Sequence, residues 1–198
     1  MPSLTTQPRD VLARLKSETA DAHARVDAIA DPALSNRRAY RQLLLGMRDA
    51  HRAIEPEFRR HAVVLARAGY DVARRSKLAW LDADLAFLGD ASDDPSPSIE
   101  LRDGTEAFGA VYVVEGATLG GQVIARRVMP ALGLSPDAGC RYFSGYGAAT
   151  RARWLETRGA IGAHVASLDS PDGITRMIAA AKETFALFAR ALGARMPS

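Results

Sequence analysis

The chain has 198 residues, of which 47% are hydrophobic, and its 26 basic and 23 acidic side chains leave a formal net charge of +3. This composition excludes a disordered chain, and the length suits one domain that buries roughly 70% of its unfolded surface. The single cysteine, Cys140, excludes an internal disulfide and any cysteine cluster for zinc or iron–sulfur centres. The arginines are scattered along the chain, so a nucleic-acid binder has only the basic charge balance in its favour.

Apolar runs are only a few residues long, too short for a membrane span. The first 18 residues, MPSLTTQPRDVLARLKSE, lack an apolar core of signal-peptide length. We therefore expect a cytoplasmic protein that binds neither membrane nor nucleic acid.

Apolar side chains recur at spacings of three and four along most of the chain, which predicts an all-α fold. In the first helix this stripe comprises Leu12, Leu15, Thr19, Ala22, Val26 and Ile29. In the last helix it comprises Ile174, Ile178, Ala181, Phe185, Phe188 and Leu192. Between them we expect helices over residues 35–68, 73–88, 100–129 and 150–168.

Prolines and glycines predict where these helices end. Asp31-Pro32 should end the first helix, and Pro56 should bend or split the second. Pro130 should stop the fourth helix, and Gly193 should end the last. We expect one domain, with residues 1–8 as a disordered tail, residues 89–99 as a surface loop and residues 133–149 irregular.

The fourth predicted helix contains more glycine than a helix tolerates without a reason. It carries Gly109, Gly116, Gly120 and Gly121, and each interior glycine costs about 1 kcal/mol relative to alanine. One reason is close helix–helix packing; the other is a flat ligand lying against the backbone. Gly116 and Gly120 share a helix face with Tyr112 one turn earlier, which suits a planar macrocycle.

Of the four histidines, His23 is the best candidate metal ligand, although a lone histidine is more often an ordinary surface or core residue. It lies beside the apolar stripe of the first helix, with Asp27 one turn later, where a carboxylate can fix the outer ring nitrogen. Lys16 lies two turns earlier, roughly 10 Å away along the helix. A ligand histidine with a cation at that distance fits heme, although Lys16 alone would be taken for a solvated residue.

Three segments resemble the heme oxygenase family, bacterial members included. LKSETADAHARVD (residues 15–27) is similar to its proximal-helix segment, YVVEGATLGGQVI (112–124) to its distal-helix segment, and AKETFALF (181–188) to its last helix. The two main motifs occur in the family's order, about 90 residues apart. The resemblance implies a single-domain helical bundle with heme held between the proximal and distal helices.

The resemblance also implies a role for each matching residue. His23 would be the proximal iron ligand, supported by Asp27, and Gly116, Gly120 and Gly121 would lie over the other heme face. The groups implied near the heme propionates or lining the pocket are Lys16, Tyr112, Arg153 or Arg158, and Phe185. Ala117 departs from the usual Ser or Asp, so distal water would be ordered by backbone carbonyls or by Thr118.

The implied reaction converts heme to biliverdin, CO and ferrous iron, using O₂ and electrons from an external ferredoxin or flavin reductase. Heme b would be both substrate and cofactor, and we expect a monomer. A bacteriophytochrome is a candidate bilin acceptor. Two alternatives remain: a heme carrier or sensor without turnover, which Ala117 favours, and a helical protein that binds another small molecule or a partner.

Overall fold

The structure is a computed structural model that describes residues 8–89 and 97–195, and these residues form helices and connections without a β-strand. The all-α prediction is confirmed. The α-helices are α1 (Pro8–Glu18), α2 (Ala20–Ala30), α3 (Arg37–Arg60), α4 (Ala62–Arg67), α5 (Leu78–Leu88), α6 (Gly104–Leu132), α7 (Arg141–Ser144), α8 (Thr150–Ala166) and α9 (Asp172–Arg195). The 3₁₀ turns are η1 (Asp31–Ser35), η2 (Val72–Arg74) and η3 (Gly147–Ala149).

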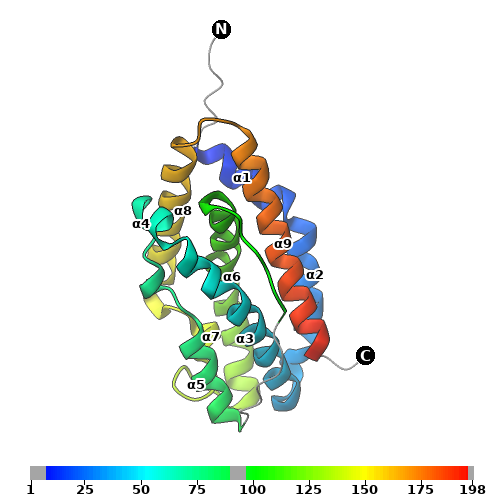
Figure 1. Cartoon of the computed structure of the whole chain (residues 1–198). Helices are drawn as coiled ribbons and strands as arrows, with labels where there is room; N and C mark the ends of the chain where they lie inside the picture. Colours follow the sequence, from blue (N-terminus) through cyan, green and yellow to red (C-terminus); the bar gives the residue numbers. More distant parts are fainter. Residues whose placement is uncertain (1–7, 90–96, 196–198) are drawn as a thin grey trace.

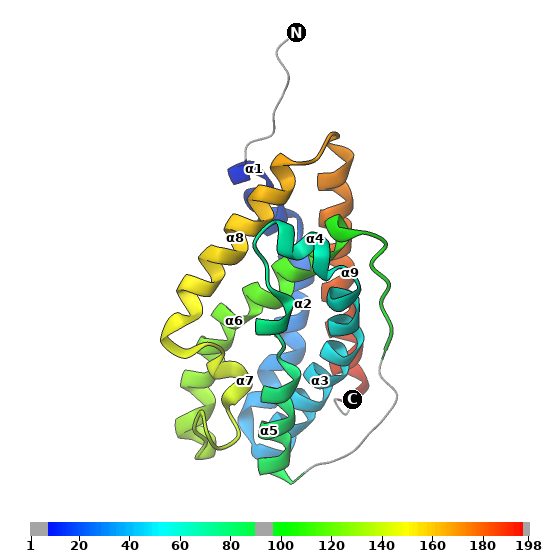
Figure 2. The same cartoon turned by 60° about the vertical axis from the view of Figure 1, so that its left-hand side comes forward.

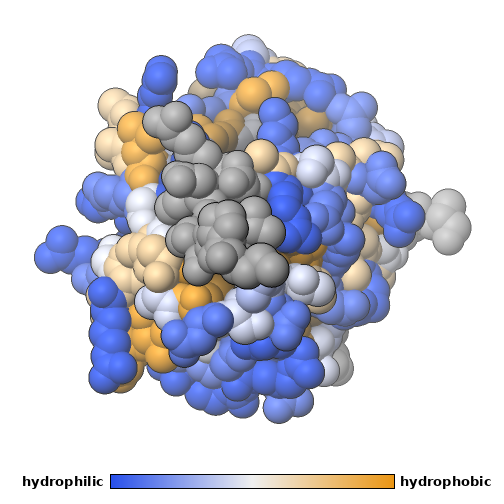
Figure 3. All heavy atoms as spheres, turned by 90° about the horizontal axis from the view of Figure 1, so that it is seen from above, coloured by the Kyte–Doolittle hydropathy of each residue, from blue (hydrophilic) through white to orange (hydrophobic). Residues whose placement is uncertain are grey.

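The long helices α3, α6 and α9 pack against one another at the centre, and α2 lies along α9 (Figure 1). The other helices surround this core, with α8 against α6 and α1, and α5 against α3 (Figure 2). The predicted inward stripe of α9 is buried from Ile174 to Leu192, as expected. Seen from the end of the bundle that carries α1, the described surface is mostly hydrophilic, with small apolar areas between the charged side chains (Figure 3).

The first predicted helix is broken in two, which the sequence did not indicate. Thr19 leaves helical geometry, with φ −105° and ψ 2°. Its buried hydroxyl donates to the Leu15 carbonyl oxygen at 2.7 Å. Such a bond back to the preceding turn bends a helix, so α2 leaves α1 at a new angle that carries His23 with it.

Two predicted helix ends fell short of the observed ends, and one predicted break lies elsewhere. The predicted second helix is split in two, but at His61, because Pro56 lies within α3, which ends at Arg60. Pro130 lies within the last turn of α6, and the helix ends at Gly133, whose φ is +63°. Gly193 lies inside α9. A proline near a helix end removes few hydrogen bonds, so the turn that contains it can stay helical.

Two other boundaries also moved. Residues 73–88 divide into η2 and α5, because the Lys77 backbone N–H donates to the Glu55 carboxylate at 2.7 Å instead of continuing a helix. Helix α6 begins at Gly104, four residues later than predicted, where the Asp103 side chain caps it by accepting from the Glu106 N–H.

The predicted tail and loop lie mostly outside the described residues. Pro8 already belongs to α1, so the predicted tail is at least one residue too long, and residues 1–7 lie outside the description. Of the predicted loop, Gly89 ends α5 with φ +80° and residues 97–99 are not helical, whereas residues 90–96 lie outside the description.

Helix α6 is the most buried long segment of the fold. By length and composition it could cross a membrane, but 56% of its apolar window is buried inside the protein, as in the core helix of a soluble fold. Gly109 explains part of its packing: a Cβ atom there would lie 2.1 Å from the Met177 carbonyl oxygen of α9. The contact between α6 and α9 therefore requires a residue without a side chain.

Candidate functional site

Helices α2 and α6 run in the same direction and are joined at two points. At one end the Thr19 side chain lies close to the Tyr112 hydroxyl. At the other, Arg127 Nη1 lies 2.7 Å from Asp31 Oδ1. The stretch between these links covers about 18 Å of α2, at 1.5 Å per residue. Along it α2 packs mainly on α9 rather than on α6 (Figure 1).

His23 lies on this stretch of α2, held from two sides. Its Nδ1 atom is 3.0 Å from Asp27 Oδ2, which confirms the predicted proximity of the two side chains. Its ring packs edge-on against Phe185 of α9, with the ring centroids 5.5 Å apart. The His23 side chain is nevertheless 57% exposed. A carboxylate on Nδ1 orients the ring and leaves Nε2 as the nitrogen available to an iron atom.

The glycines of α6 divide into two kinds. A Cβ atom at Gly121 would lie 3.1 Å from the Phe143 carbonyl oxygen, so Gly121, like Gly109, is needed for packing. A Cβ atom at Gly120 would meet nothing within 4 Å, and one at Gly116 would make only an ordinary contact with Trp154. No packing contact explains Gly120. Of the two reasons considered for the glycines, packing accounts for Gly109 and Gly121 but not for Gly120.

Ala117 and Thr118, which lie between Gly116 and Gly120, differ in the groups they offer to a ligand. Ala117 is exposed, beside Gly116 and Gly120. Thr118 is buried, and its hydroxyl donates to the Glu115 carbonyl oxygen at 2.6 Å. Its Cβ atom lies near Gly145, on the side of α6 that faces the α7–α8 connection. Thr118 thus bonds within its own helix, and the exposed position belongs to Ala117.

The groups predicted to lie near the propionates occupy neighbouring helices. Tyr112 is half-buried against Trp154, with ring centroids 5.8 Å apart, and burial raises the pKa of its hydroxyl. Lys16 is exposed on α1, one turn before Thr19. Arg158 is exposed on α8, one turn after Trp154 and therefore on the same side of that helix.

Arg153 has a different set of partners. Its Nη1 atom lies 3.0 Å from Glu156 Oε2, and its carbonyl oxygen accepts from the Arg75 guanidinium. Of the two predicted arginines, Arg158 is therefore the one whose position fits a contact with an anion near Tyr112.

Behind Gly116 lies a buried charged group that sequence reasoning missed, here called the Glu115 cluster. Its members are Glu115, Tyr70, Arg75, Lys77 and Tyr146. Glu115 is fully buried, and its carboxylate accepts from all four of the other side chains at 2.8–3.2 Å. The clue in the sequence is a carboxylate inside an otherwise apolar helix, because such a group is almost never buried unpaired.

Burial sets the protonation behaviour of this cluster. It lowers the pKa of Lys77, against the opposing pull of Glu115. It raises the pKa of Tyr70 and of Tyr146, an effect that Glu115 reinforces. Both phenols therefore remain hydrogen-bond donors at neutral pH.

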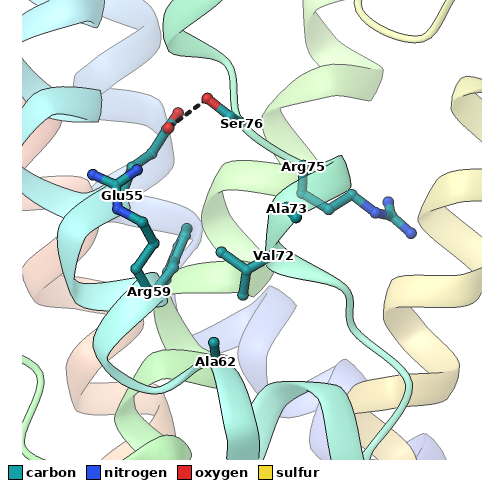
Figure 4. Close-up of a pocket in the computed structure, with 8 residues that line it drawn as sticks. Glu55, Arg59, Ala62, Val72, Ala73, Arg75 and Ser76 are labelled. Atoms are coloured by element: carbon teal, nitrogen blue, oxygen red, sulfur yellow. Dashed lines mark hydrogen bonds between the residues drawn. The ribbon is translucent and has the colours of Figure 1, made fainter.

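A cavity of about 290 Å³ lies at the surface beyond this cluster, between α3, α4 and η2 (Figure 4). Apolar side chains line most of it, and the Ser76 hydroxyl donates to the Glu55 carboxylate at 2.6 Å on one side. The Arg75 guanidinium points away from it (Figure 4). None of the predicted site residues lines this cavity. Among the described residues, no group of three or more His, Cys, Asp or Glu side chains could hold a bare metal ion.

Comparisons with known proteins bear on the fold and on the family. No curated protein matches the sequence. A heme oxygenase from Neisseria meningitidis, solved with NO and CO bound, is 21% identical with a TM-score of 0.75, over 93% of this chain and 91% of that chain. A heme oxygenase from Leptospira interrogans is 16% identical with a TM-score of 0.76, over 93% and 98% of the two chains. Both similarities establish the fold.

The family assignment comes from the sequence itself. The model of the family described as heme oxygenase matches residues 9–194, nearly the whole chain. The chain belongs to the heme oxygenase family.

Proposed function

We propose that this protein is a heme oxygenase that cleaves heme to biliverdin, CO and ferrous iron, with heme as substrate and cofactor. One observation carries the proposal: an accessible histidine on α2, its Nδ1 atom held by Asp27, beside an α6 that presents Gly120 without a packing partner. The family match supports the same reaction.

Each side chain then has a task in binding. His23 Nε2 would bind the iron, Asp27 keeps the ring oriented, and Phe185 supports the ring from α9. Lys16, Tyr112 and Arg158 hold the propionates and so fix how the macrocycle is rotated in its site. That rotation selects which meso carbon is oxidised. When bound, heme supplies the redox chemistry, with O₂ and electrons from an external donor.

On the distal side we assign to the backbone of α6 the roles that side chains would otherwise have. Gly116 and Gly120 let α6 approach the macrocycle closely, which restricts the space above the iron. Ala117 carries no polar group, and the Thr118 hydroxyl is used within the helix. We therefore assign the ordering of distal water to backbone carbonyl groups of α6. The front of α6 offers no strong acid of the kind that favours peroxidase chemistry.

The wider setting follows from the same proposal. Electrons come from a ferredoxin or flavin reductase, and the protein acts as a cytoplasmic monomer. A bacteriophytochrome remains a candidate acceptor for the bilin.

Hemin titration followed by reduction in air tests this function. The wild-type protein should give a sharp Soret band, and His23→Ala should remove that band's histidine-ligated form. His61→Ala is the matched control, because His61 lies on the α3–α4 connection and bonds the Leu101 carbonyl oxygen. On reduction, the Soret band should decay as a bilin band grows, and chromatography should identify one biliverdin isomer.

The same experiment separates the alternative function. Ala117 favours a heme carrier or sensor, since the position that commonly bears a hydroxyl or carboxylate in the family is apolar here. A histidine-ligated Soret band that survives reduction in air would identify a carrier. A protein that binds no hemin would refute both functions.

A further inference from the structure

We propose that Glu115 is a positioning residue that fixes the rotation of α6, so that Gly116 and Gly120 face the heme. This inference rests on the proposed function. It starts from the placement of one buried carboxylate next to the first of these glycines. Glu115 is fully buried and Gly120 is exposed. The two residues are five apart, which puts them about 140° apart around the helix.

Gly116 and Gly120 of α6 make few packing contacts with the rest of the protein. Gly120 has no neighbour that a Cβ atom would touch, and Gly116 has only Trp154. Each glycine also weakens the helix by about 1 kcal/mol relative to alanine. This is the part of α6 that tolerates rotation or bending most easily, yet it is the part that would define the distal surface.

Glu115 counters that weakness by joining α6 to segments on both of its flanks. Tyr70 Oη donates to Oε1 at 3.1 Å, Lys77 Nζ donates to Oε1 at 2.8 Å, and Arg75 Nη1 donates to Oε2 at 3.2 Å. These three residues lie on the connection between α4 and α5. Tyr146 Oη, on the α7–α8 connection, donates to Oε1 at 3.1 Å. Links from two directions resist rotation better than links from one.

Arg75 also bonds to α8, the helix that packs against Gly116. Arg75 Nη2 donates to Glu156 Oε2 at 2.7 Å, and its Nη1 atom donates to the Arg153 carbonyl oxygen. Both acceptors belong to α8, which carries Trp154 against Gly116. Arg75 therefore couples the residue behind Gly116 to the helix that packs beside it.

Every other member of the Glu115 cluster donates to its carboxylate, so loss of the carboxylate removes one hydrogen bond from each of them. Lys77 Nζ uses its three donors on Glu115, on the Arg75 carbonyl oxygen and on Tyr146 Oη, at 2.6–2.8 Å. Buried Lys77 has no route to water that would replace the lost carboxylate. With Glu115→Gln, the amide nitrogen would face donors, and α6 would have to turn or shift to relieve the contact.

Glu115→Gln is the direct test, and Glu106→Gln is the matched control. Glu106 is also a buried carboxylate of α6, paired with Arg102, but it lies in the first turn, more than two turns before Gly116. In the protein without heme, hydrogen–deuterium exchange should accelerate at amides 116–121 in Glu115→Gln. In Glu106→Gln any acceleration should stay near residues 104–109.

With heme bound, three readouts should change together in Glu115→Gln. The midpoint of the ferric alkaline transition should shift, a second bilin isomer should appear, and turnover should fall by up to about a hundredfold, as for a small misplacement of reacting groups. Glu106→Gln should leave all three as in the wild type. If Glu115→Gln does not fold, Tyr70→Phe removes a single donor to the same carboxylate and should shift the readouts in the same direction by less.

Two failures are distinguishable. If wild-type protein binds hemin and Glu115→Gln reproduces its alkaline midpoint and isomer pattern while losing only thermal stability, the carboxylate is merely structural and this inference is overturned. If wild-type protein binds no hemin, the proposed function fails, and the inference fails with it.

Discussion

The buried side of α6, which carries Glu115, and its exposed side, which carries Gly120, differ in how many contacts they make. On the back, Glu115 is fully buried and its carboxylate is surrounded by four donors. On the front, Gly120 has no contact at all within reach of a Cβ atom. A helix whose front must stay free of side chains cannot be held from that side. The difference indicates that the exposed side of α6 is held in place by interactions made on its buried side.

The comparison extends to the glycines. Gly109 is required by the close approach of α9, whereas Gly120 is required by nothing in the described protein. The same residue type therefore serves packing at one end of α6 and is available for ligand binding further along. Substitutions can separate these uses, because stability responds to the first and heme affinity to the second.

The largest expected effect is a loss of stability when the buried side of α6, which carries Glu115, loses a partner. Lys77→Met removes a buried cation and leaves Glu115 with fewer donors, so the free energy of unfolding should fall by about 3 kcal/mol. The double variant Lys77→Met with Glu115→Leu should not recover that loss, because Arg75, Tyr70 and Tyr146 then lose their shared acceptor. Urea denaturation of the three proteins measures this. A single variant as stable as the wild type would show that the cluster is not an anchor.

A smaller loss is expected where α6 meets α9. Gly109→Ala places a Cβ atom against the Met177 carbonyl oxygen, so the helices must move apart, at a cost of about 2 kcal/mol. Gly120→Ala is the control and should raise stability by up to about 1 kcal/mol, because alanine is the better helix former. Equal effects of the two substitutions on the urea midpoint would contradict the division between packing and ligand glycines.

Substitutions on the exposed side of α6, which carries Gly120, should change heme affinity rather than stability. Gly120→Leu places a side chain over the site and should weaken hemin binding at least tenfold, which corresponds to about 1.4 kcal/mol. The unfolding free energy of the protein without heme should not decrease. Hemin titration followed by absorbance gives the affinity, with Gly159→Leu on exposed α8 as the control. Unchanged affinity would remove Gly120 from the site.

The smallest effect concerns pH. Burial lowers the pKa of His51, so the folded protein keeps this ring neutral while the unfolded chain protonates it near pH 6.5. Burial alone would raise the pKa of Glu55, but the His51 ring, whose Nδ1 atom is 3.3 Å from Glu55 Oε1, and the hydrogen bond from the Ser76 hydroxyl bring it below its ordinary value. Both groups bind protons more readily in the unfolded chain, so stability should decline as pH falls from 7 toward 4.

His51→Gln checks this assignment, because glutamine does not titrate. Unfolding free energies at pH 7 and pH 5 should differ less in the variant than in the wild type. A variant with an undiminished difference would place the pH dependence on other groups, such as His164, whose pKa burial also lowers.

Local sequence patterns were enough for the helices and for part of the site. The α9 stripe ending at Leu192 was readable because a spacing of three and four places residues on one face whatever the helix packs against. The pairing of His23 with Asp27 was readable for the same reason, since both residues lie one turn apart on one helix. The break at Thr19 was not readable, because it depends on a buried hydroxyl that bonds to the preceding turn, and the continuation of α6 through Pro130 runs against the local signal.

By itself the sequence determined which residues share a helix face, and hence that His23 has a carboxylate beside it and that Gly116 and Gly120 lie together. Only the tertiary structure decided that Gly121 packs while Gly120 is open, that Thr118 turns away from the front, and that Lys77 is buried against Glu115. Periodicity acts over a few residues of one helix. Pairings across 38 residues, as between Lys77 and Glu115, depend on how the helices are stacked, and that depends on the whole core.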